Sequence, residues 1–114
     1  DVVRPGVKPG DIGAAIQKVA EREGFSIVRE LVGHGVGFEV HEAPAIPNYG
    51  SKGSGVALPI GTVIAIEPML NLGKKDIVTA SDGWTVLTQD GAVSAHEELT
   101  VAVVEGGVRV LTKV

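Results

Sequence analysis

Residues 9–24, PGDIGAAIQKVAEREG, carry the first regular pattern of hydrophobic and polar positions along the chain. Apolar residues recur there at the i, i+3 and i+4 spacing that gathers them on one face of a helix. These residues are Ile12, Ala15, Ile16, Val19 and Ala20. With Asp11 available as the N-cap and Gly24 as the C-cap, the pattern predicts one amphipathic helix.

The remainder of the chain alternates short apolar runs with turn-forming residues, a pattern typical of strands. A β-branched run at 26–31 is followed by a glycine-punctuated turn at 34–37. Residues 42–59 hold three of the six prolines and indicate a long ordered loop. Further strands are predicted over residues 62–70, 85–88, 96–105 and 108–114, the last two joined by a turn at Gly106 and Gly107.

These elements predict an α+β fold, with one main amphipathic helix packed on an antiparallel-rich sheet. The sequence has no internal repeat and no linker long enough to separate two domains, so we expect residues 1–114 to form a single domain. Hydrophobic residues make up 44% of the chain but aromatic residues only 4%, so the core must consist mainly of aliphatic side chains.

Charge and cysteine content narrow the class of protein. The net charge of -4 and the absence of a Lys/Arg cluster argue against a nucleic-acid or anionic-membrane surface. No apolar run approaches the ~20 residues of a membrane span, and residues 1–6 lack the layout of a signal peptide and an initiator Met. We therefore expect a processed chain or a piece of a longer one. The absence of cysteine suits a cytoplasmic protein and leaves only oxygen and imidazole ligands for a metal.

Two glutamates need a chemical explanation. Glu67 interrupts the apolar run 63–69, where an unpaired buried carboxylate costs several kcal/mol. The alternative is a strand-end glutamate that faces solvent, because Pro68 follows it. Glu98 precedes the run 99–104, where it either faces inward or belongs to an exposed acidic edge.

Two histidines flank the glycine-rich turn. His34 stands between Gly33 and Gly35, where the backbone can approach a neighbour closely; an isolated histidine in such a turn is more often structural than a ligand. His41 follows seven residues later, at a spacing that matches no simple helical zinc motif. One imidazole with two carboxylates would form a hard donor set suited to Mn, Fe(II), Co or Zn.

The same residues lie in five blocks that resemble, in order, the signature blocks of type I methionine aminopeptidases. The blocks are GHGVGFEVHEAP at 33–44, PNYG at 47–50, AIEPML at 65–70, DGWTVLTQDG at 82–91 and SAHEELTV at 94–101. The preceding helix region also resembles that family, so the resemblance covers nearly the whole chain. It implies the carboxy-terminal half of a pita-bread fold, in which two α/β halves sandwich a pair of divalent ions.

The resemblance implies a role for each residue that matches a block. His34, Glu67 and Glu98 resemble metal ligands, with Glu98 bridging both ions. His41 resembles the histidine that contacts the substrate peptide, and Trp84 a residue near the pocket for the N-terminal methionine. The implied reaction is removal of that methionine from a peptide or nascent protein, with the metals polarising the scissile carbonyl and His41 and Glu67 assisting catalysis.

The sequence also departs from the family pattern. The family's two aspartate ligands belong to the first half of the fold, which this sequence does not contain, so we expect weak or absent metal binding by this chain alone. Glu97 stands where an aromatic residue is common, Leu99 where a histidine often follows, and Val40 where Phe is frequent. Without the first half of the fold, the apolar surface that it would cover is exposed. We therefore expect this chain to form a homodimer or to pair with a separate amino-terminal half.

Two other functions compete with this reading. Prolidase and aminopeptidase P share the fold and the GHGVG and HEAP blocks, whereas the DGWT and SAHEE blocks favour the methionine enzymes. A non-catalytic peptide- or protein-binding module of the same fold is the alternative outside enzymes. The joint presence of His34, Glu67 and Glu98 argues against that module.

Overall fold

The predicted helix, α1 (Pro9–Arg22), is present in the computed structural model of the chain, which describes residues 1–113. It begins before the predicted cap: Asp11 is not the N-cap but lies in the first turn, where its carboxylate accepts a hydrogen bond from the Lys8 N–H (3.0 Å). The first helical position tolerates a proline, here Pro9, because an N–H group at that position would have no partner within the helix. The Lys8 and Gly53 N–H groups that donate to Asp11 lower the pKa of its carboxyl.

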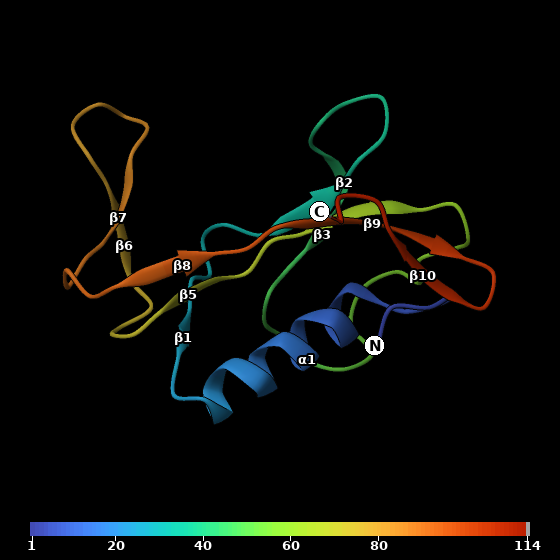
Figure 1. The fold of residues 1–114 in the computed structure, drawn as a ribbon, viewed down its shortest axis with the longest axis horizontal. Helices are drawn as coiled ribbons and strands as arrows, with labels where there is room; N and C mark the ends of the chain where they lie inside the picture. Colours follow the sequence, from blue (N-terminus) through green and yellow to red (C-terminus); the bar gives the residue numbers. More distant parts are fainter. Residues whose placement is uncertain (114) are drawn as a thin grey trace.

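Short antiparallel strands make up most of the remaining structure. They are β1 (Ser26–Ile27), β2 (Gly33–Gly35), β3 (Glu42–Ile46), β4 (Val63–Ile66), β5 (Met69–Asn71), β6 (Ile77–Thr79), β7 (Val86–Thr88), β8 (Ser94–His96), β9 (Leu99–Val104) and β10 (Gly107–Val110). The five-stranded sheet has the order β10-β9-β4-β2-β3, and a three-stranded sheet has the order β1-β5-β8. Strands β6 and β7 form a separate hairpin. The predicted antiparallel-rich α+β fold is therefore confirmed, with α1 beneath the sheets (Figure 1).

Some predicted boundaries were wrong. Residues 34 and 35 of the turn predicted at 34–37 belong to β2, and residues 42–46 of the predicted loop form β3. The single strand predicted over residues 62–70 is broken after Ile66, because Pro68 has no N–H to donate to a ladder. The end of the last predicted strand, Val114, lies outside the described residues. No helix within residues 1–113 is long and apolar enough to cross a bilayer.

The five-stranded sheet has two chemically different faces. Ile64 and Val101 lie opposite each other in the β4–β9 pair and belong to the buried core cluster that includes Ile12 of α1. Because side chains alternate across a strand, the next opposed pair, Ala65 and Thr100, lies on the other face. The core therefore occupies the helix side of the sheet, and small or polar residues occupy the opposite side.

Helix α1 also packs directly against the loop that follows β3. A Cβ built on Gly13 would lie 2.2 Å from the Tyr49 carbonyl oxygen, so only glycine fits at this contact. Between this loop and the sheet, Asn48 is fully buried and its Nδ2 donates to the Glu67 carbonyl oxygen at 3.4 Å. The helix thus supports, through a single loop, the backbone at the break between β4 and β5.

We predict that Gly13→Ala destabilises the chain although alanine is the better helix former, because the added methyl group would collide with backbone atoms. The free energy of unfolding should fall by about 1–3 kcal/mol in a urea titration. Gly107→Ala is the control: a Cβ there meets nothing within 4 Å, and its effect should stay within about 0.5 kcal/mol. A neutral or stabilising effect at Gly13 would contradict the described packing.

Candidate metal centre

Strand pairing brings Glu67 and Glu98 face to face. The β4–β9 ladder ends with Ile66 opposite Leu99, and the β5–β8 ladder resumes with Met69 opposite His96. The two ladders keep the same register across the gap, so the intervening Glu67 comes opposite Glu98. The Glu97 N–H, which donates to the Pro68 carbonyl at 3.3 Å, holds the two segments together inside the gap.

His34 reaches the same point from the neighbouring strand. It pairs with Ala65 in the β2–β4 ladder, and Ala65 lies two residues before Glu67, so both side chains project from the face opposite α1. One nitrogen of His34 and one carboxylate oxygen each of Glu67 and Glu98 lie within 4.8 Å of one another. The structure therefore brings the three predicted metal ligands together.

A contact with the backbone determines which ring nitrogen of His34 is available to bind a cation. Its Nδ1 lies 2.8 Å from the Gly35 carbonyl oxygen, which can only accept a hydrogen bond, so Nδ1 carries a proton. In the neutral ring, Nε2 then presents a lone pair, and it faces Glu67 Oε1 at 3.2 Å. Two electron-rich atoms at this distance require a cation between them, either a proton or a metal ion. A backbone carbonyl that orients a histidine in this way is typical of metal sites.

The two facing carboxylates, Glu67 and Glu98, also require a cation nearby. Like charges directly opposite each other across an antiparallel ladder are unfavourable unless a cation neutralises them. The side chain of Glu67 is only 15% exposed, so water offsets little of this repulsion. Glu98 is exposed rather than buried. The donor set therefore fits a hard divalent ion.

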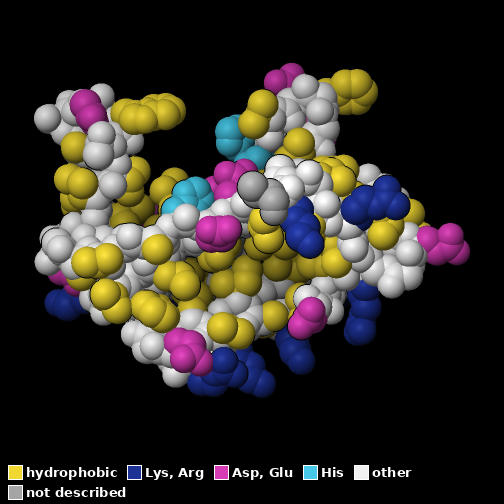
Figure 2. Space-filling view, viewed as in Figure 1, with side chains coloured by type: hydrophobic (Ala, Val, Ile, Leu, Met, Phe, Trp, Pro, Cys, Tyr) yellow, Lys and Arg dark blue, Asp and Glu magenta, His cyan; other side chains and the backbone are white. Residues whose placement is uncertain are grey.

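Two projections rise on either side of these residues (Figure 1). One is the β6–β7 hairpin, and the other is the segment between β2 and β3. Figure 2 shows histidine and acidic side chains gathered in the hollow between them. His41, at the base of the β2–β3 segment, is exposed, and its ring centroid lies 4.2 Å from that of His34. His41 is therefore beside the three ligands and free to contact another molecule.

Trp84, in contrast to His41, does not line the cavity beside the candidate ligands. It lies in the turn of the β6–β7 hairpin and is 87% exposed. Asp82 fixes this turn: its Oδ1 accepts hydrogen bonds from the Trp84 and Thr85 N–H groups at 2.9 and 2.8 Å. The Thr85 hydroxyl, together with these N–H groups, lowers the pKa of the Asp82 carboxyl. The turn is ordered although its tryptophan is solvated.

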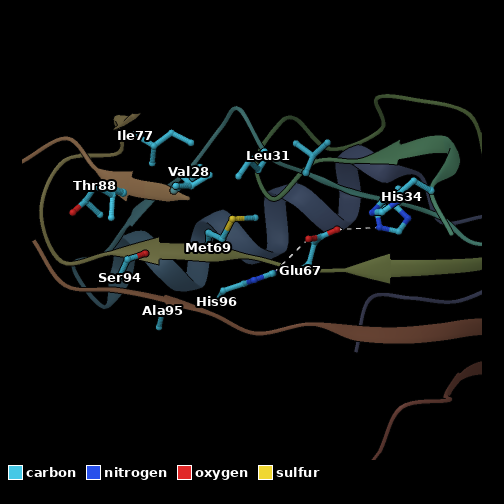
Figure 3. Close-up of a pocket in the computed structure, with 14 residues that line it drawn as sticks. Val28, Leu31, His34, Glu67, Met69, Ile77, Thr88, Ser94, Ala95 and His96 are labelled. Atoms are coloured by element: carbon cyan, nitrogen blue, oxygen red, sulfur yellow. Dashed lines mark ion pairs between the residues drawn. The ribbon is translucent and has the colours of Figure 1, made fainter. Parts of the chain in front are cut away.

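An open cavity of about 510 Å³ extends from the candidate ligands along the base of the hairpin (Figure 3). His34, His41 and Glu67 line one end. The rest of the wall is mostly apolar and comes from Val28, Leu31, Val32, Met69, Ile77, Val86, Leu87, Thr88, Ser94, Ala95 and His96. A polar, ligand-rich end joined to an apolar wall is typical of sites that process molecules with an apolar group.

The structure adds one residue to the site that the sequence analysis did not identify. His96 Nε2 lies 3.4 Å from Glu67 Oε2, so the Glu67 carboxylate stands between two imidazoles, with His34 on its other side (Figure 3). A signal was available: His96 lies two residues before Glu98 in an extended segment, and such residues share a face.

The sequence analysis also missed Asn48. Its Oδ1, alone among the buried side-chain polar atoms within residues 1–113, has no hydrogen-bond partner.

A family comparison agrees with this geometry. The model of metallopeptidase family M24 matches residues 1–110, nearly the whole chain. The chain therefore belongs to metallopeptidase family M24.

Relatives by sequence are named methionine aminopeptidases. Methionine aminopeptidase A of Synechocystis sp. is 54% identical over 112 residues, which are 98% of this chain and 44% of that protein. The methionine aminopeptidase of Escherichia coli K12 is 50% identical over 111 residues, 97% of this chain and 42% of that protein. The chain thus spans less than half the length of these relatives.

The chain is also similar to solved structures of methionine aminopeptidases. The methionine aminopeptidase of Rickettsia prowazekii superposes with a TM-score of 0.96 at 46% identity, over 99% of this chain and 46% of that one. For the Thermotoga maritima methionine aminopeptidase the TM-score is 0.95 at 47% identity, over 98% and 45%. The dipeptidase PepE of Mycobacterium ulcerans is less similar, with a TM-score of 0.65 at 28% identity, over 100% and 25%. The prediction of an α+β part of a pita-bread fold is therefore confirmed.

We predict that Glu98→Gln stabilises the metal-free chain, because the substitution removes one of two facing charges. In EDTA, the free energy of unfolding should rise by a few tenths of a kcal/mol, up to about 1 kcal/mol. Glu105→Gln, in the β9–β10 turn, makes the same change in net charge away from the site and serves as the control. Equal effects of the two substitutions in a urea titration would show that Glu67 and Glu98 do not repel each other.

Proposed function

We propose that this chain is the metal-binding part of a metallo-aminopeptidase that removes the N-terminal methionine from peptides and nascent proteins. The observation that carries this proposal is the convergence of His34, Glu67 and Glu98 at one end of an apolar cavity. The names of relatives about 50% identical over the chain's span support the choice of substrate.

We propose His34 Nε2, Glu67 and Glu98 as the metal ligands, with Mn, Fe(II), Co or Zn as the ion. A bound divalent ion would supply Lewis-acid polarisation of the scissile carbonyl. The resemblance implies two ions and two aspartate ligands that match no position of this chain. We therefore propose weak binding by the chain alone and a complete site only with a separate amino-terminal half or a second copy of the chain.

His41 and Glu67 are the proposed catalytic residues. The exposed His41 ring, held beside His34, donates a hydrogen bond to the substrate carbonyl oxygen as negative charge develops there. Glu67 is the more buried of the two carboxylates, and it accepts the proton of the attacking water. Both roles require that the scissile bond lie above the ligand end of the cavity.

The apolar wall provides the proposed binding site for the first side chain of the substrate. Met69, Leu87 and their neighbours offer a surface without charge that suits an unbranched apolar chain such as methionine. Trp84 belongs to the hairpin that supplies part of this wall, and we propose it as a substrate contact at the rim. The cytoplasm is the proposed compartment, because nascent proteins are the proposed substrates and the chain has no cysteine.

The test has a binding arm and an activity arm. Calorimetric titration with Mn²⁺ should show binding that His34→Ala weakens by at least about 10-fold, because one ligand of three is lost. His41→Ala should leave Mn²⁺ affinity unchanged. With a separate amino-terminal half supplied, Met-Ala-Ser should be hydrolysed in preference to X-Pro peptides, and His41→Ala should lower kcat by about 10²–10³-fold.

Two results would count against the proposal. Preferential cleavage of X-Pro peptides would assign the chain to the prolidase or aminopeptidase P type. Absence of Mn²⁺ or Co²⁺ binding both in the chain and in the reconstituted pair would favour a non-catalytic binding module.

A further inference from the structure

We propose that His96 is a positioning residue for Glu67: its ring N–H holds one carboxylate oxygen so that the other remains directed at the ligand cluster. This inference rests on the proposed metal centre, because Glu67 is one of its ligands. It assigns a function to a histidine that none of the sequence blocks identified as a site residue.

The contacts of Glu67 carry the argument. Oε1 lies 3.2 Å from His34 Nε2, and Oε2 lies 3.4 Å from His96 Nε2, so each oxygen has its own imidazole partner (Figure 3). A glutamate side chain with three free torsions loses conformational entropy when it is held in one orientation. Contacts at both oxygens restrict the rotation of the carboxylate. A contact at Oε1 alone would leave it free to turn about that point.

His96 is itself held by the sheet. It is the last residue of β8, its Cα lies opposite Met69 of β5, and the ladder continues to Ser94 opposite Asn71. The Ser94 hydroxyl donates to Asn71 Oδ1 at 2.7 Å, and Asn71 is fully buried. The imidazole is therefore presented by a strand with a fixed register rather than by a free loop.

The geometry favours a positioning role over direct ligation. His96 is not in the group of residues whose donor atoms lie within 4.8 Å of one another, which within residues 1–113 consists of His34, Glu67 and Glu98. It contacts the oxygen of Glu67 that faces away from His34. The side chain of His96 is 46% exposed, whereas that of His34 is 14% exposed, so His96 lies farther toward solvent along the cavity.

A hydrogen bond to the second oxygen of a ligating carboxylate has a known chemical effect. It fixes the carboxylate in a one-oxygen binding mode, and loss of such an outer partner typically lowers metal affinity by 10–100-fold. A side-chain amide can donate the same hydrogen bond, whereas an aliphatic side chain cannot. These differences separate His96→Gln from His96→Leu.

The first arm of the test measures metal binding. In calorimetric titrations of the 114-residue chain with Mn²⁺, His96→Leu should weaken binding by about 10-fold or more, and His96→Gln should restore most of the affinity. Glu97→Gln is the matched control, because residue 97 lies between His96 and Glu98 and alternation points its side chain to the opposite face. Its affinity should equal that of the parent chain. Thermal melting of each metal-free variant checks that the fold is intact.

The second arm needs no metal. In the metal-free chain with ¹⁵N-labelled histidines, the ring resonances of His96 should shift in Glu67→Gln and remain unchanged in Glu98→Gln. Unchanged His96 resonances in Glu67→Gln would overturn the proposal. Absence of Mn²⁺ binding both in the parent chain and in the reconstituted pair would rule out the proposed metal centre, whereas this arm still decides whether His96 contacts Glu67.

The Co²⁺-loaded chain separates the two roles of an imidazole. A positioning His96 predicts the same visible absorption spectrum for His96→Gln as for the parent. A spectral change that indicates loss of a nitrogen ligand, together with no recovery of affinity in His96→Gln, would show that His96 is a direct ligand and would overturn the positioning role.

Discussion

Two carboxylates face each other across an antiparallel ladder in this chain, and the organisation of the site depends on that opposition. Glu67 and Glu98 occupy the gap between two ladders that share one register. Their repulsion is a local cost that strand pairing in the rest of the sheet offsets. A divalent ion would convert this cost into a binding interaction, with His34 supplying the third donor.

The two faces of the sheet divide the tasks of folding and function. On one face, Ile64 and Val101 pack toward α1 and form the buried core. On the other face, Ala65 and Thr100 lie in the same row as His34. Because alternation fixes which side chains share a face, a shift of one residue in the register of either strand would turn the glutamate of that strand toward the apolar core. The register is therefore specified by core packing, and the site follows from it.

Much of this could be predicted from the sequence, because strong local patterns determine it. The spacing of apolar residues gives α1, and the position of Glu67 within an apolar run marks a residue that needs a partner. The break at Pro68 and the strand at 33–35 depend on pairing between distant segments, which single-sequence patterns do not reveal. For His96 the sequence offered a local signal, its spacing of two residues from Glu98, but its contact with Glu67 follows from the β5–β8 register.

The most direct test of this account is the position of a bound ion. In crystals of the chain soaked with Zn²⁺, diffraction at the zinc absorption edge should give an anomalous peak bonded to His34 Nε2 and to oxygens of Glu67 and Glu98, at about 2.0–2.2 Å. A zinc ion bound only by surface carboxylates such as Asp76 or Asp90, with none at the three predicted ligands, would contradict it.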